Sequence, residues 1–254
     1  MAARPIFVVA GLGNGSGTGA ATARLFAKNG YRVALIARSS SGETEKFAQE
    51  LNDAGGEAAP FPVESYSFQE VTDAFGRVKQ RWPDADLRVA LYNASFGAFK
   101  GFLDVTEDDI NTGLETSLKG AYAFSRQAVL QMKEQSIDDN GKRGTILFTG
   151  ATASIRGNTM TSGFSPGKSG LRALAQSLNK EFGKSNIHVR QTIIDGVIST
   201  DKTRAHYPLA RDNPNNPDIL LKPEAIAHAY LYLTNQDRSA WSFELDLRPA
   251  HEKW

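Results

Sequence analysis

A glycine-rich segment near the start of the chain has the residue types and spacing of a phosphate-binding loop. It runs Gly-Leu-Gly-Asn-Gly-Ser-Gly-Thr-Gly over residues 11–19, directly after the apolar run Ile6–Ala10. Glycines let the backbone turn tightly and let a phosphate approach, and free N–H groups at the start of a following helix can hold its charge. Two registers of Gly-x-x-x-Gly-x-Gly fit, two residues apart. We favour the later one, Gly13, Gly17 and Gly19, because it leaves a helix of about three turns behind the loop.

The order of apolar and amphipathic segments predicts a doubly wound α/β fold. Apolar runs alternate with segments of helical period, which is typical of a mostly parallel, seven-stranded Rossmann-type sheet with helices on both faces. The expected strands are Ile6–Ala10, Arg32–Ala37, Glu57–Pro62, Leu87–Leu91, Thr145–Thr149, His188–Ile194 and Ser242–Asp246. The expected helices are Thr18–Asn29, Gly42–Ala54, Phe68–Arg81, Thr106–Glu134, Phe164–Phe182 and Pro223–Thr234. No linker or repeat interrupts the pattern, so we expect one domain over residues 1–254.

One segment, Ser199–Lys222, departs from this alternation. It contains Pro208, Pro214 and Pro217 and reads as a mostly irregular loop. Long loops inside compact domains are usually lids or binding loops, and this one follows a strand end, where open parallel sheets bind ligands. The sequence therefore predicts a substrate lid at about residues 199–222.

Composition excludes several classes of protein. The chain has 29 basic and 28 acidic residues and no cysteine. A near-zero net charge argues against nucleic acid or a membrane as the main partner, and the absence of cysteine excludes thiolate chemistry and cysteine-ligated metals. No apolar run approaches the ~20 residues of a membrane span, and no secretory leader is evident. We expect a cytoplasmic protein without a metal, acting on a small molecule.

Together with the glycine loop, four later segments make the chain resemble the single-domain branch of the short-chain dehydrogenase/reductase family over nearly its whole length. They are Tyr31–Arg38, Tyr92–Ser95, Gly167–Leu178 and Asp195–Thr200. The second resembles the family's Asn-Asn-Ala-Gly turn. Lys168 in the third matches the lysine that holds the nicotinamide ribose. Asp195 stands where the family has proline.

The resemblance implies a nicotinamide dinucleotide as cofactor, and Arg38 favours NADP(H). An arginine at the end of the second strand offers a planar fork of donors to a 2′-phosphate, whereas a carboxylate there would repel it. The alternative is that Arg38 simply ends the strand in solvent. The implied cofactor contacts are Gly13, Asn14, Ser16, Gly17, Thr18, Gly19, Arg38, Ser39, Glu64, Asn93, Ala94, Ser95, Lys168, Gly196, Val197, Ile198 and Thr200.

The family's catalytic residues are mostly absent from the matching positions. Phe164 stands four residues before Lys168, where the family has its tyrosine acid. Ala151 and Ser117 occupy the serine and asparagine positions, and Thr152 is a candidate replacement donor. Losing a general acid typically costs about 10²–10⁴ in rate. The Phe-x-x-x-Lys pattern resembles an atypical subgroup that keeps the lysine without the tyrosine.

These residues favour an NADPH-dependent reductase whose substrate does not need the missing tyrosine. A conjugated C=C or a C=N bond fits better than a simple ketone, because an enolate spreads its charge and weaker donors can hold it. Two alternatives remain open: a non-redox cyclase, isomerase or lyase using the same cleft, and a catalytically silent regulatory protein that binds the dinucleotide. The resemblance also implies a homodimer or homotetramer.

Overall fold

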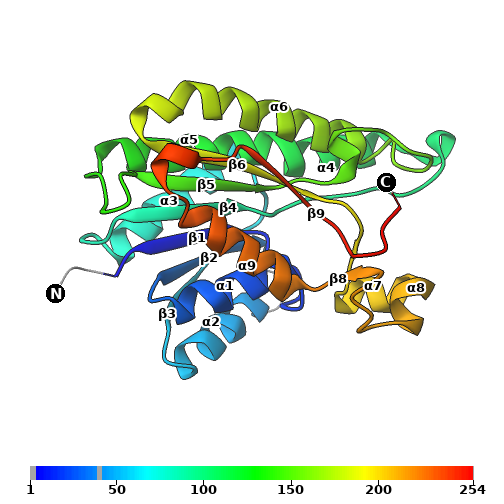
Figure 1. Cartoon of the computed structure of the whole chain (residues 1–254), viewed down its shortest axis with the longest axis horizontal. Coiled ribbons are helices and arrows are strands. Elements are labelled where there is room, and N and C mark those ends of the chain that lie inside the picture. Colours follow the sequence, from blue (N-terminus) through cyan, green and yellow to red (C-terminus); the bar gives the residue numbers. More distant parts are fainter. Residues whose placement is uncertain (1–3, 39–41, 254) are drawn as a thin grey trace.

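The computed structural model describes residues 4–38 and 42–253. Seven of the strands in these residues form a parallel sheet in the order β3-β2-β1-β4-β5-β6-β9 (Figure 1). The strands are β1 (Ile6–Ala10), β2 (Arg32–Arg38), β3 (Glu57–Val63), β4 (Leu87–Tyr92), β5 (Gly144–Thr149), β6 (Ile187–Ile194) and β9 (Glu244–Leu247). This confirms the predicted doubly wound α/β fold. The last strand begins two residues later than expected, because the Ser242 backbone N–H and hydroxyl bond to Gln236 instead.

Helices cover both faces of the sheet. One face carries α1 (Thr18–Lys28), α2 (Glu43–Asp53) and α9 (Pro223–Thr234), and the other carries α3 (Phe68–Arg81), α5 (Gly120–Glu134) and α6 (Ser165–Phe182). Alternate strand residues face the two layers: Val8 packs in one core and Val9 in the other. None of the helices in the described residues is long and apolar enough to cross a membrane.

The predicted helix Thr106–Glu134 is wrong in one respect, because it is not continuous. Its first part is α4 (Glu107–Leu114), and a π-helical turn, Glu115–Lys119, separates α4 from α5. The Tyr92 hydroxyl donates a hydrogen bond to the Thr116 carbonyl inside this turn. A side chain at Gly120 would collide with that hydroxyl. A buried tyrosine therefore inserts into the helical hydrogen-bond pattern, one of the recognised causes of helix distortion.

The expectation of a mostly irregular segment at Ser199–Lys222 is also wrong. The segment contains α7 (Asp201–His206), α8 (Pro208–Asp212) and β8 (Leu220–Leu221), and β8 pairs with β7 (Val197–Ile198). Thr200 caps α7 in a reciprocal capping box, and Pro208 occupies the first turn of α8. A proline is compatible with that position, because its missing N–H would have no helical partner there. Figure 1 shows these short helices standing apart from the sheet's covering layers.

Candidate active site

The predicted site residues gather where the strands end at their carboxyl edge. The glycine loop follows β1, Arg38 ends β2, the Asn93–Ser95 turn follows β4, and Gly196 opens the turn after β6. In an open parallel sheet, ligands bind at this edge, near the point where the strand order reverses. The order β3-β2-β1-β4 places that reversal between β1 and β4. The strand ends therefore bring the separated sequence segments to one place.

The glycine loop packs closely at two of its residues. Gly11 has a φ of 93°, and a side chain there would collide with the backbone of Ala94. A side chain at Gly19, in the first turn of α1, would collide with the Gly11 carbonyl oxygen. Gly13 lies in open space, so the close approach to the turn after β4 is made by Gly11 rather than by the first glycine of the favoured register. Asn93 fixes the contact, donating from Nδ2 to the Gly11 carbonyl at 2.7 Å.

The surface around the loop fits a phosphate-bearing nucleotide. A cavity of about 410 Å³ is lined by the loop residues 12–16 and by Arg38, Arg24 and Lys46. No side chain caps the N-terminus of α1 at Gly17, so its first N–H groups remain available to an anion. The Thr18 hydroxyl is buried without a hydrogen-bond partner among residues 4–38 and 42–253. The arrangement could cradle the phosphates of a dinucleotide.

Three cationic side chains line this cavity, and one of them is already engaged. Arg24 forms an ion pair with Glu50 at 2.7 Å, donates to the Gly15 carbonyl at 2.9 Å and stacks over Phe47. Arg38 and Lys46 complete the set. Sequence analysis did not single out Arg24 or Lys46, because a cation on an amphipathic helix ordinarily faces solvent.

Some predicted contacts lie outside this cavity or outside the described residues. Glu64 follows β3, is exposed and does not line the cavity; its N–H is bonded to the Glu70 carboxylate. Ser95 is exposed after β4, and Ala94 beside it is buried. Ser39 lies outside the described residues.

The α7 end of the 199–222 segment closes against the glycine loop. The backbone N–H of Asp201 donates to the Ser16 hydroxyl at 3.0 Å, and Asn14 donates to the Asp201 carboxylate at 3.4 Å. The Thr200 methyl group lies 3.8 Å from where a Cβ on Gly17 would stand. The segment expected to cover the site therefore touches the loop directly.

Lys168 is the buried cation of the site. It is 3 % exposed, and its Nζ donates to the Thr149 carbonyl at 2.8 Å. Burial lowers the pKa of the Lys168 ammonium to about 8. The Thr149 hydroxyl bonds to Asn93 Oδ1 at 2.8 Å and to the Tyr230 hydroxyl at 2.7 Å. Thr149 and Tyr230, missed by sequence analysis, thus connect the lysine to the turn that holds the glycine loop.

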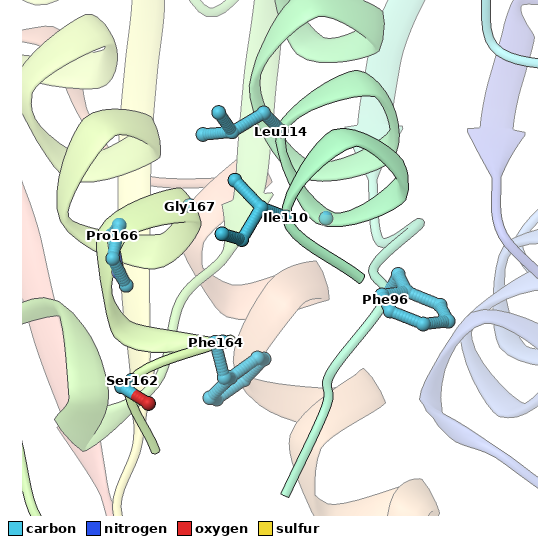
Figure 2. A pocket seen from close by; sticks show the side chains of 9 residues that line it. Phe96, Ile110, Leu114, Ser162, Phe164, Pro166 and Gly167 are labelled. Atoms are coloured by element: carbon cyan, nitrogen blue, oxygen red, sulfur yellow. The ribbon is translucent and has the colours of Figure 1, made fainter. Parts of the chain in front are cut away.

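The surroundings of Phe164 are apolar. Its ring packs against Phe99 with centroids 4.9 Å apart, and the Lys168 Nζ lies 5.6 Å from its centroid. A pocket of about 140 Å³ opens beside it, lined by Phe96, Ile110, Gly113, Leu114, Ser162, Gly163, Phe164, Pro166 and Gly167 (Figure 2). Ser162 supplies the one side-chain hydroxyl among these described residues. The pocket suits an apolar group better than a polar one.

Comparison with known proteins identifies the family. The short chain dehydrogenase profile matches residues 7–208. The chain belongs to this family. A mouse 3-oxoacyl-[acyl-carrier-protein] reductase is 30% identical over 200 residues, 78% of each chain. The crystal structure of a short-chain dehydrogenase from Rhodopseudomonas palustris has 28% identity and a TM-score of 0.76, covering 97% of this chain and 99% of that one.

The fold is shared with more distant members as well. An alcohol dehydrogenase from Thermococcus sibiricus, complexed with 5-hydroxy-NADP, matches with a TM-score of 0.81 at 24% identity, covering 98% of each chain. Members of the short-chain dehydrogenase family are oxidoreductases that bind nicotinamide dinucleotides and typically act on small molecules. The cradle around the glycine loop fits such a cofactor.

The residues that sequence analysis expects at the family's tyrosine, serine and asparagine positions are Phe164, Ala151 and Ser117. Phe164 is the N-cap residue of α6, one turn before Lys168, and Ala151 lies two residues after the end of β5. Ser117 lies buried in the π-helical turn, where its Cβ is 3.0 Å from where a Cβ on Gly167 would stand. Phenylalanine and alanine have no proton to donate.

A second polar group occupies the same edge of the sheet. The Thr152 hydroxyl donates to the Asp195 carboxylate at 2.5 Å. The other carboxylate oxygen of Asp195 lies 3.4 Å from Nε of Arg248. Asp195, which sequence analysis expects at the family's proline position, is buried and leads into the turn at Gly196, where φ is 144°. The turn continues through β7 (Val197–Ile198) to Thr200.

Proposed function

We propose that the chain is a cytoplasmic, NADPH-dependent reductase of a conjugated C=C or a C=N bond rather than of a simple ketone. The observation that carries this proposal is Phe164, packed against Phe99 next to an intact, buried Lys168. A ketone becomes a strongly basic alkoxide and needs an acid close by, whereas an enolate spreads its charge and a C=N bond that is already protonated becomes a neutral amine. The site retains its cation and has lost its acid.

The chain's own residues would hold the dinucleotide along the strand ends. The glycine loop and the N-terminus of α1 would bind its phosphates, and Arg38 would pair with a 2′-phosphate. Lys168 would hold the nicotinamide ribose, and the turn at residues 196–200 would hold the carboxamide. When bound, the cofactor supplies a hydride. Phe164 and the apolar pocket beside it would exclude water from the reacting bond.

The test measures NADPH consumption, through the nicotinamide absorbance, with a panel of enones, imines and ketones. We expect turnover of enones or imines and little turnover of ketones. Turnover of ketones alone would contradict the proposal. Product formed without a change in absorbance would instead indicate a non-redox enzyme, and tight cofactor binding without any turnover would indicate a regulatory protein.

A further inference from the structure

We propose that Asp195 and Thr152 bind a protonated nitrogen of the substrate, so that the bond reduced is a C=N bond held as an iminium. This inference rests on the proposed reductase function and chooses between the two bonds that it leaves open. It also predicts that the site binds the ammonium group of the amine product.

The hydrogen bond between Thr152 and Asp195 determines which of their atoms can accept a hydrogen bond from a ligand. The Thr152 hydroxyl has two acceptors within reach, the Asp195 carboxylate at 2.5 Å and the Ile194 carbonyl at 3.4 Å, so its single proton is directed to the nearer one, Asp195. The oxygen of the partly exposed Thr152 keeps two lone pairs that can accept hydrogen bonds from a ligand. While Thr152 donates that proton to Asp195 it can only accept a hydrogen bond from a substrate, whereas the sequence predicts a donor role for it. Beside the Asp195 carboxylate, a protonated N–H group is the donor that gains most from both residues.

The charges around the turn also favour a cation. Arg248 lies 3.4 Å from Asp195 and 2.8 Å from Asp246, so one guanidinium serves two carboxylates. A third carboxylate, Glu252, lies 3.3 Å from where a Cβ on Gly196 would stand. Two carboxylates, Asp195 and Glu252, therefore lie at this turn, whereas Asp246 lies on β9 and shares Arg248 and the nearby Arg172. The excess negative charge would attract a positively charged ligand.

The position of the pair suits a substrate beside the cofactor. Thr152 directly follows Ala151, the residue at the family's serine position, and is partly exposed. Asp195 directly precedes the turn expected to hold the nicotinamide. An iminium needs no acid at residue 164 or 151: as a hydride reaches its carbon, the C=N π pair becomes the lone pair of the amine nitrogen. The absence of a tyrosine at position 164 and the presence of the Asp195 carboxylate would then both favour an iminium substrate.

The first experiment measures binding instead of turnover. Calorimetry on NADP⁺-loaded protein compares pyrrolidine, which is protonated at neutral pH, with tetrahydrofuran, an uncharged ring of similar size. We expect the ammonium to bind at least about tenfold more tightly. Asp195→Asn should remove most of that preference, and Thr152→Val should lower it about threefold or more. Asp246→Asn is the matched control: it removes a carboxylate from the same arginine without touching Thr152, and should change the preference less than about twofold.

Thermal unfolding of each variant shows whether it is folded, and Thr152→Val, which keeps the side-chain shape, tests the inference if Asp195→Asn does not fold. Equal binding of the two rings by the wild type, or an equal loss in Asp246→Asn and Asp195→Asn, would overturn the inference. The assay panel separates it from the proposed function. Turnover of enones but not of a cyclic imine overturns the inference and leaves the reductase standing, whereas turnover of neither contradicts the reductase itself.

Discussion

At the residue scale, the burial of Lys168 should make the stability of the protein depend on pH. Its pKa falls from an ordinary 10.5 to about 8 because the ammonium is buried. Between these pH values the unfolded chain binds more protons than the folded one, so the free energy of unfolding rises with pH through that window. Below pH 8 the buried ammonium destabilises the cofactor-free protein by a constant amount.

Lys168→Met should therefore stabilise the cofactor-free protein at pH 7 by about 1–3 kcal/mol and remove the rise in stability between pH 8 and 10. Denaturant unfolding at a series of pH values measures both effects. Lys180→Met, at an exposed lysine on the same helix, is the control and should change neither. An unchanged pH dependence in Lys168→Met would contradict the assignment of a buried cation.

Phe164 defines a gain-of-function prediction. A tyrosine in its place would put a hydroxyl on a ring whose centroid is 5.6 Å from the Lys168 ammonium. Phe164→Tyr combined with Ala151→Ser should raise ketone reduction by about 10²-fold or more, because a general acid and an orienting hydroxyl return. Phe99→Tyr adds a hydroxyl to the neighbouring ring and is the control. If the double variant and Phe99→Tyr give the same ketone activity, the missing acid does not set the specificity.

Arg38 should determine which dinucleotide binds. In the wild type we expect NADPH to bind at least about tenfold more tightly than NADH, because a guanidinium pairs with the 2′-phosphate. Arg38→Ala should weaken the binding of NADPH and leave the binding of NADH nearly unchanged, so NADH serves as the internal control. Fluorescence titration measures both affinities. Equal affinity of the wild type for the two cofactors would contradict the assignment.

Site residues whose contacts are close in the sequence could be predicted, whereas those with contacts far away in the sequence could not. The loop at residues 11–19 was predictable from local glycine chemistry, but whether Gly11 or Gly13 makes the close contact depends on the backbone of Ala94, far away in sequence. The link from Tyr230 to Thr149 joins residues that are 81 positions apart. Sequence patterns record local periodicity and carry no information on such a pair.

At the scale of elements, α9 supports the site from outside it. Tyr230 is fully buried, and its hydroxyl lies 2.7 Å from that of Thr149, whose own partner Asn93 holds the glycine loop. Burial raises the pKa of the Tyr230 phenol, so it stays neutral. The helix thus fixes the ends of β1, β4 and β5 relative to one another.

Tyr230→Phe should lower the free energy of unfolding by about 1–2 kcal/mol, because it removes one buried hydrogen bond. It should also weaken NADPH binding, since Asn93 would hold the Gly11 carbonyl less firmly. Tyr232→Phe changes an exposed tyrosine of the same helix and is the control. Chemical denaturation and cofactor titration measure the two effects. Identical behaviour of the two variants would show that α9 does not support the loop.

Element types were more predictable than their interruptions. The strands and long helices followed from apolar periodicity, whereas the π-helical turn depends on the hydroxyl of Tyr92, which no periodicity encodes. The two short helices α7 and α8 were missed because prolines suggested irregular chain. Pro208 begins a helix instead. From the sequence alone, a proline that starts a helix cannot be told from one that breaks it.

At the scale of the whole molecule, several large apolar side chains are exposed on one layer. Tyr122 and Leu130 on α5 are 50% and 46% exposed, and Ile110 on α4 is 48% exposed. Phe102 and Leu103, in the chain leading to α4, are more exposed still. Exposed apolar patches commonly mark protein interfaces. We propose that this layer forms the interface of a homodimer, or one interface of a homotetramer.

Light scattering should therefore give a mass of two or four times the 27.6 kDa chain. Tyr122→Asp combined with Leu130→Asp places two charges on the proposed interface and should shift the mass toward the monomer, because burying unpaired carboxylates is costly. Tyr232→Asp, at an exposed tyrosine on α9 across the sheet, is the matched control. It should leave a dimer intact. A monomeric wild type would contradict the proposed interface. Dissociation by the α9 variant alone would show that the chains associate through α9 instead of α4 and α5.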